Sequence, residues 1–192
     1  MKKVTVKLQS MTPYQQGGEV SEKKLQRETP DAYEERTWKG RAHIGADGKA
    51  FIPPMAFKKA IETASRFSGE QIPGKGKERY TKTFVSGVVC TYGPSLGITS
   101  DEISGEWRFV PSDGKAGGGR RVWKCFPTFK EWAGQAEFII YDDQVTKEVF
   151  ERHLKIAGIL VGIGVWRREK GGLNGQFHPT EFLWEEMSID SI

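Results

Sequence analysis

The stretch AEFIIYDDQVTKEVFERHLKIAG, residues 136–158, contains a strand and a helix joined by a short acidic turn. Apolar and aromatic side chains dominate residues 136–141, as they do in a buried strand. Asp142, Asp143 and Thr146 then provide side chains of the kind that begin helices. After this start, apolar residues recur at helical spacing, at Val149, Phe150, Leu154 and Ala157. The sequence therefore predicts a strand followed by a helix that ends with this stretch.

A second strand and helix lie nearer the start of the chain. Residues 2–9 alternate apolar and polar side chains, so they should form a strand with one buried face. The pair Pro53-Pro54 suits a first helical turn, and apolar residues follow at helical spacing up to Phe67. On the solvent side of this helix we expect three basic residues, Lys58, Lys59 and Arg66.

Further strands complete the predicted order. We expect one at residues 83–91, two at 106–110 and 121–126 as central strands flanking a basic hairpin at about 111–122, and the last at 176–187. The order strand, helix, strands, helix, strand matches a split βαβ arrangement. The predicted fold is therefore α+β and ferredoxin-like (RRM-like), with two helices on one face of an antiparallel sheet.

The 192 residues fit a single domain with insertions. Residues 19–49 are charged and turn-rich, which predicts an insertion. Within it we expect a hairpin from Trp38 to Ile44 that turns back at residues 46–48. Residues 69–82 should form a basic loop, because glycine and proline interrupt them repeatedly.

Composition indicates a globular protein. Apolar residues make up 37% of the chain and charged residues 28%, with a net charge of +4. No run approaches the roughly 18 apolar residues that span a bilayer, and residues 1–10 alternate where a signal peptide would be continuously apolar. We therefore expect a cytoplasmic protein without membrane contact. Cys90 and Cys125 lie in strand-like contexts and are expected to be buried free thiols.

Residues 157–177, AGILVGIGVWRREKGGLNGQF, combine six glycines with basic residues and a tryptophan. Glycines let backbone amides approach phosphates, arginines pair with phosphate oxygens, and tryptophan stacks on bases. The alternative is a tight, glycine-dependent connection whose arginines are merely solvated. As candidate nucleic-acid contacts the segment offers Gly162, Gly164, Trp166, Arg167, Arg168 and Lys170.

The predicted basic hairpin is a second candidate surface. Arg120, Arg121 and Lys124 lie beside a glycine run and would order on a phosphate backbone. A solvated loop is the alternative. For four other aromatic residues we expect core packing: Trp107, Trp123, Trp132 and Trp184.

Three segments resemble the RAMP superfamily, the RNA-binding proteins of CRISPR effector complexes. Residues 157–177 resemble the glycine-rich loop of that family. Residues 8–18, LQSMTPYQQGG, resemble the first strand and turn of its backbone subunits, and residues 51–61, FIPPMAFKKAI, resemble the entry to its first helix. The three segments follow the family's order. The chain departs from the family pattern at Pro54-Met55 and at Lys58-Lys59.

The resemblance implies an RNA path along the start of the first helix and the glycine-rich loop. It also implies that residues 19–49 form an inserted hairpin, called a thumb, that kinks the bound RNA strand. It further implies self-association along the nucleic acid, and CRISPR-type or phage partner proteins. Because the chain departs from the pattern and has only 192 residues, we expect a stand-alone relative, for instance one encoded by a phage. The implied contacts to the RNA backbone are Lys58, Lys59, Arg167, Arg168 and Lys170, and the implied stacking residues are Trp38 and Trp166.

We expect a protein that binds single-stranded RNA or DNA, RNA in preference, and that is not an enzyme and holds no cofactor or metal. Its histidines, His43, His153 and His178, lie in different segments without metal-ligand spacing. Two alternatives stay open. One is a protein-interaction module or inhibitor that mimics a CRISPR effector subunit, and the other is an RNA endonuclease using Asp31 or Glu34 after the first strand.

Overall fold

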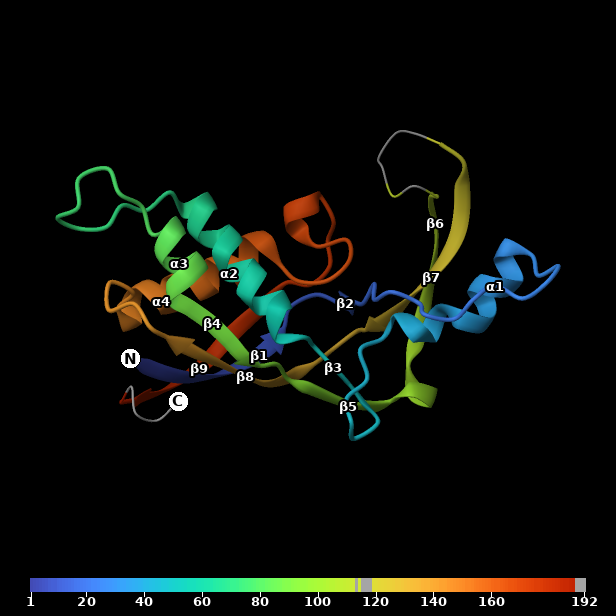
Figure 1. Ribbon diagram of the computed structural model, residues 1–192, viewed down its shortest axis with the longest axis horizontal. Coiled ribbons are helices and arrows are strands. Elements are labelled where there is room, and N and C mark those ends of the chain that lie inside the picture. The colour runs from blue at the N-terminus through green and yellow to red at the C-terminus, as the bar shows by residue number, and fades with distance from the viewer. Residues whose placement is uncertain (113, 115–118, 189–192) are drawn as a thin grey trace.

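The computed structural model of the chain describes residues 1–112, 114 and 119–188. Figure 1 shows a helix-covered sheet at one end of the molecule and a smaller sheet at the other. Within the described part of the chain, no helix has both the length and the apolar character needed to cross a membrane.

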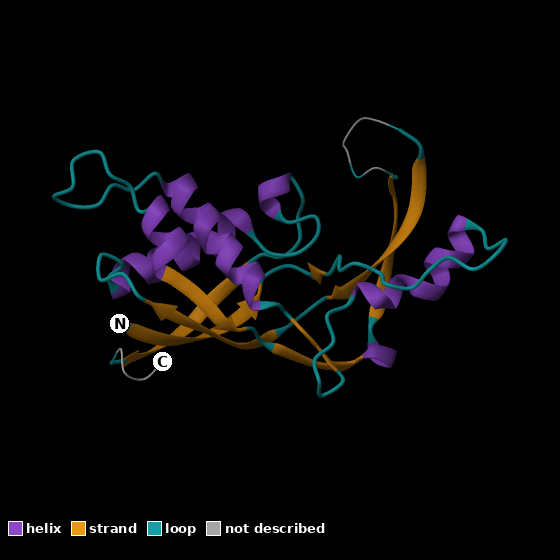
Figure 2. Ribbon diagram, in the orientation of Figure 1, coloured by secondary structure: helices purple, strands orange, loops and turns teal. Residues whose placement is uncertain are grey.

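The larger sheet has four strands, β1 (Lys2–Ser10), β4 (Val88–Tyr92), β8 (Ala133–Ile140) and β9 (Phe177–Glu186). Their order across the sheet is β4-β8-β1-β9, and all neighbours are antiparallel. Helix α2 (Pro54–Ser68) follows β1 and helix α4 (Lys147–Ile156) follows β8, and the two pack together on one face of the sheet (Figure 2). This order of strands and helices is that of a ferredoxin-like fold, so the predicted fold class is confirmed.

The alternation in β1 decides which face of the sheet the helices cover. Its apolar side chains are almost completely buried and pack with apolar residues of α2 and α4. Thr146 begins α4 as predicted, because its side chain accepts a hydrogen bond from the Val149 N–H at 3.3 Å. The core between sheet and helices includes Val4, Val6, Leu8, Phe57, Ile61, Phe138, Phe150 and Leu154.

The outward face of the central strand β1 is polar. Lys3 pairs with Glu137 at 3.1 Å, and Lys7 pairs with Glu181 at 2.6 Å. RRM domains stack bases on aromatic side chains of their sheet. The outward positions of β1 here are Lys3, Thr5 and Lys7, so this strand offers no stacking ring.

The smaller sheet is built around a long antiparallel ribbon of β6 (Ser104–Pro111) and β7 (Arg121–Phe129), with β2 (Tyr14–Gln15) on the other edge of β7. Strands β3 (Lys49–Phe51) and β5 (Ser95–Thr99) form a separate pair, followed by the 3-10 turn η2 (Ser100–Glu102). The two strands predicted around the basic hairpin are confirmed. They do not lie in the main sheet as predicted: β7 is central only in the smaller sheet, and β6 is at its edge. The reason is that β-branched and aromatic content indicates a strand without indicating its partners. Part of the hairpin tip, residues 113 and 115–118, lies outside the described residues.

The strand predicted at residues 83–91 is half wrong. Its first half belongs to helix α3 (Thr81–Gly87), and only β4 is extended. The ammonium of Lys58 donates to the carbonyls of Phe84 and Val85 at 2.6 and 2.8 Å, which stabilises the end of this short helix. Such a tertiary contact overrides the strand preference of the local sequence.

The insertion at residues 19–49 contains helix α1 (Pro30–Thr37) and the 3-10 turn η1 (Trp38–Arg41). The predicted hairpin strand from Trp38 is therefore wrong at its start. Its turn is confirmed, since the Gly48 N–H donates to the Gly45 carbonyl and Ile44 bridges Ala50.

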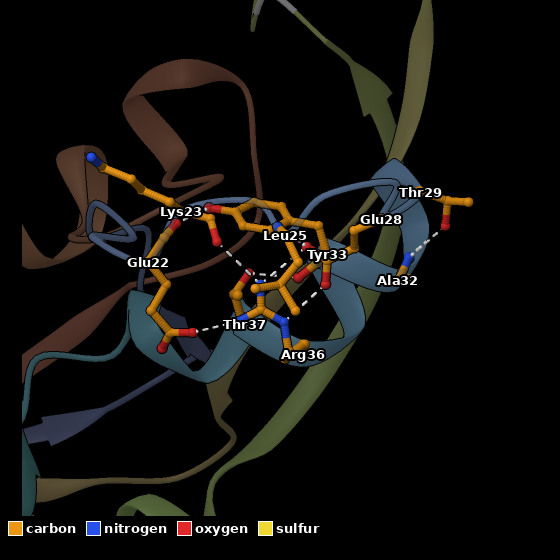
Figure 3. Close-up of polar contacts among 9 residues, drawn as sticks. All are labelled: Glu22, Lys23, Leu25, Glu28, Thr29, Ala32, Tyr33, Arg36 and Thr37. Atoms are coloured by element: carbon orange, nitrogen blue, oxygen red, sulfur yellow. Dashed lines mark hydrogen bonds and ion pairs between the residues drawn. The ribbon is translucent and has the colours of Figure 1, made fainter.

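Polar contacts fold the insertion onto itself. Arg36 bonds Glu22 at 2.8 Å and Glu28 at 2.9 Å, and the Thr29 side chain accepts from the Ala32 N–H at 3.2 Å to begin α1 (Figure 3). Helix α1 therefore forms without a strongly apolar face.

Candidate nucleic-acid interface

Two adjoining cavities form a groove between the helix-covered sheet and the ribbon. The first, of about 470 Å³, lies between the start of α2 and residues 161–167. The second, of about 750 Å³, lies between residues 17–20, residues 165–166 with Lys170, and the ribbon β6–β7. Gly17 and Val165 line both cavities. The two together are called the groove below.

The groove brings together predicted site residues from three distant segments: α2, β7 and the glycine-rich segment. The first cavity is lined by four of the predicted residues, Lys59, Gly162, Gly164 and Arg167. The second is lined by three more, Lys124, Trp166 and Lys170. Their proximity agrees with one site, and their contact with nucleic acid stays a prediction.

The glycine-rich segment leaves α4 through the π-helical turn η3 (Ala157–Val161) and packs tightly against β2. The Val165 N–H donates to the Gln15 carbonyl at 2.9 Å. Gly164 has a φ of +78°, and a Cβ on it would lie 2.3 Å from the Gln15 carbonyl oxygen. A Cβ on Gly172 would lie 1.7 Å from the carbonyl oxygen of Trp166. Chain packing therefore accounts for these glycines, with or without a phosphate nearby.

Trp166 occupies the wall of the second cavity in a strained backbone conformation. Its φ is +58°, a left-handed value that costs a non-glycine residue about 1–2 kcal/mol. The ring is 38% exposed, and the Arg108 guanidinium lies over it, 5.3 Å from its centroid. The Asn174 N–H donates to the Trp166 carbonyl at 3.0 Å and helps to hold this conformation. Backbone strain at a cavity wall is common at binding sites, so Trp166 is a strong candidate contact.

The 3-10 turn η4 (Arg168–Lys170) supplies most of the charge near this wall. Arg167 bonds the Glu169 carboxylate at 2.8 Å, and Lys170 lies 3.4 Å from the same carboxylate. Burial alone would raise the pKa of Glu169, but the hydrogen bond and charge of Arg167 and the charge of Lys170 outweigh it and lower the pKa. Arg167 is thus partly neutralised, whereas Lys170 stays largely exposed. Arg168 is exposed on the same turn but does not line the groove.

His43 lines the first cavity without adding positive charge. Burial lowers its pKa below the ordinary value, so the ring is neutral at neutral pH. Sequence reasoning placed His43 with the other dispersed histidines and missed its place beside the glycine-rich segment. Only the fold brings the two together.

The two candidate catalytic acids of the endonuclease alternative lie outside the lining of the groove. Glu34 is buried, pairs with Arg41 at 2.8 Å and accepts a hydrogen bond from the Cys125 N–H at 2.8 Å. These contacts tie α1 to the edge of β7, so the Glu34 carboxylate is held in a structural role. Asp31 is exposed in the first turn of α1 and does not line the groove. In the described part of the chain, no three His, Cys, Asp or Glu side chains gather as a metal site would require.

Lys58 is not on the solvent side of α2 as predicted. It is only 8% exposed, its ammonium reaches the carbonyls at the end of α3, and it pairs with Glu62 at 3.0 Å. The helical pattern predicted that Lys58 is exposed together with Lys59. In the structure Lys59 is exposed, and it pairs with Glu62 at 2.9 Å. The pattern could not show that α3 covers that side of the helix.

Trp38 was predicted to stack on bases, and in the structure its ring packs against β6. Its ring lies so close to Gly105 of β6 that a Cβ there would be 2.9 Å from it. Arg120 and Arg121 lie at the end of the ribbon, outside the groove.

Core packing is confirmed for Trp132, which is buried, and for Trp184, which packs against the core. It is wrong for Trp107 and Trp123, which are 44% and 49% exposed. Cys90 and Cys125 are buried free thiols, as predicted.

Comparison with solved structures gives a distant likeness. No protein-family model matches the chain, and no curated protein matches it in sequence. Among solved structures, a chain described as "CRISPR RNA-guided surveillance complex" aligns with 91% of this chain at 10% identity and a TM-score of 0.38. The alignment covers 66% of that chain, less than two thirds of its length.

Proposed function

We propose that this protein binds single-stranded nucleic acid, RNA in preference to DNA, by holding the phosphate backbone in the groove. The charge of the groove carries the proposal. Among the described residues that line it, one is acidic, Glu169. Its basic lining residues are Arg41, Lys59, Lys124, Arg167 and Lys170.

Buried carboxylates reduce this charge without cancelling it. Arg41 is paired with Glu34 and Lys59 with Glu62, so neither is a free cation. Among the described residues, Lys124 has no carboxylate within ion-pair distance. Lys170 has one there, that of Glu169, which Arg167 also binds. A phosphate backbone would therefore meet its strongest attraction in the second cavity, near Lys124 and Lys170.

The shape of the groove favours a strand over a small molecule. The two cavities lie side by side, with Gly17 and Val165 in the lining of both. A run of phosphates could follow them from the start of α2 to the ribbon. The preference for RNA, assembly along the strand and a relation to CRISPR effector subunits rest on the resemblance of residues 8–18, 51–61 and 157–177 to the RAMP superfamily. On this proposal the protein binds the strand without cleaving it.

A salt titration of binding tests the proposal directly. Labelled single-stranded RNA, single-stranded DNA and duplex DNA of equal length are titrated with protein at several salt concentrations. We expect single strands to bind more tightly than the duplex, with log affinity falling linearly in log salt by about 0.7 for each phosphate contact. A flat salt response, or no binding to any of the three, would contradict the proposal.

A further inference from the structure

Three exposed aromatic side chains gather on one face of the ribbon. Directly opposed residues in an antiparallel pair share a face, and alternate residues along a strand share a face. Phe109 is opposite Trp123, and Trp107 lies two residues from Phe109 on β6. The three side chains are 44%, 47% and 49% exposed for Trp107, Phe109 and Trp123 in turn. This set is called the aromatic face below.

The aromatic face has the geometry of a stacking surface. The ring centroids of Phe109 and Trp123 are 5.3 Å apart, with an angle of 45° between the rings. Trp107 is displaced along β6 by roughly 6.8 Å, two residues of strand rise. Two neighbouring bases could therefore each meet a ring.

The charge on this face is positive. Pro111 is opposite Arg121, which continues the same face toward the hairpin tip. The Arg121 guanidinium lies 5.4 Å from the Phe109 ring centroid and donates to the Phe109 carbonyl at 2.6 Å. Arg121 is the one charged residue among the paired positions of this face, while Glu106 is on the opposite side of β6. Aromatic rings interleaved with a cation are suited to unpaired bases and their phosphates.

The other face of the ribbon borders the groove. Val110, Lys124 and Phe126 line the second cavity, and strand alternation puts them opposite to the aromatic face. A strand that leaves the groove at Lys124 would reach the ribbon edge and then the aromatic face. The ribbon thus offers cations toward the groove on one side and rings on the other.

We infer that the aromatic face, Trp107, Phe109 and Trp123 with Arg121, stacks unpaired bases of the strand whose phosphates the groove holds. This inference rests on the proposed function and adds a base-binding site to it. Stacking is tolerant of base identity, because every base has a π-face, so the contact would strengthen binding without strong sequence preference.

The test compares oligonucleotides with and without bases. Wild-type protein is titrated with a single-stranded oligouridylate and with an abasic strand of equal length and equal phosphate count, at one salt concentration. The variant Trp107→Leu, Phe109→Leu, Trp123→Leu keeps an apolar face and removes the rings. The control Phe67→Leu, Tyr92→Leu, Tyr141→Leu removes three exposed aromatic rings elsewhere on the surface.

We expect the wild type and the control to bind the base-bearing strand at least about 30-fold more tightly than the abasic one, as two stacked bases would give. The leucine variant should bind both strands with the abasic affinity. Equal wild-type affinity for both strands would refute the stacking site and leave the proposed function standing. Failure of the wild type to bind either strand would refute both. A leucine variant that keeps the preference for bases would also refute the site, as would a change of its oligomeric state with unchanged RNA binding, which would mark a protein-docking face.

If the triple variant fails to fold, the single change Trp123→Leu decides. It should lower affinity for the base-bearing strand by about tenfold and leave the abasic affinity unchanged. An equal loss for the two strands would refute the stacking site.

Discussion

Reversing two charges in the second cavity should weaken nucleic-acid binding far more than reversing two charges elsewhere. Lys124 and Lys170 both line this cavity, and the Lys170 side chain is 63% exposed. In the variant Lys124→Glu, Lys170→Glu, two charge-assisted contacts of about 1.5–3 kcal/mol each would be lost. The loss of at least about 3 kcal/mol corresponds to more than 100-fold in Kd. The slope of log affinity against log salt should also fall by roughly 1.4, since two phosphate contacts disappear.

The matched control is Lys75→Glu, Lys77→Glu. Both lysines are exposed in the loop between α2 and α3, at the end of the molecule far from the ribbon (Figure 1). Each double variant lowers the net charge by four units from its value of +4. Filter binding to single-stranded RNA measures affinity, and urea unfolding should show changes within about 0.5 kcal/mol for both proteins. If the two variants lose affinity equally, attraction is diffuse and the groove is not the site.

Three further predictions concern stability. Lys58→Met should lower the free energy of unfolding by about 3 kcal/mol, measured in urea, because it leaves Glu62 buried with one cation fewer and frees two carbonyls of α3; an unchanged midpoint would contradict the buried role. Gly172→Ala should destabilise by more than about 2 kcal/mol through its clash with the Trp166 carbonyl, whereas Gly171→Ala, with open space around its Cβ, should cost only about 1 kcal/mol for its φ of +76°. Burial lowers the pKa of His153 in the folded state. Its contribution to the free energy of unfolding is therefore complete above the unfolded pKa, near 6.5, and is lost as the pH falls below that value. The urea midpoint should drop from pH 7 toward pH 5, and it should drop less in His153→Gln.

The sequence allowed the sheet and its two helices to be predicted because their patterns are local. Alternation in β1 and helical spacing in α2 and α4 each fall within one element. The course of residues 83–87 could not be predicted in the same way. Its helix depends on Lys58, which lies more than twenty residues earlier and donates to its last carbonyls. Local strand preference therefore gave the wrong answer there.

The candidate site could be predicted only where its residues are close together in the sequence. Glycine, arginine and tryptophan in one short segment drew attention to residues 162–170, and the structure places Lys59 and Lys124 beside them. The sequence could not show that Arg167 is partly neutralised by Glu169, since either charge could have faced solvent alone. Nor could it show that Arg41 and His43, from the insertion, line the same groove.

The sequence could not show that the aromatic face is exposed. Alternation in β6 indicates that Trp107 and Phe109 share one face, and that Arg108 and Val110 share the other. It does not say which face will be covered. In the structure, the second cavity lies on the side of Val110, which is buried, whereas the rings of Trp107, Phe109 and Trp123 face solvent. Burying the rings instead would remove more apolar surface from water. A fold that leaves them exposed forgoes that stabilisation, and base stacking is the role that fits their spacing and the positive charge of Arg121.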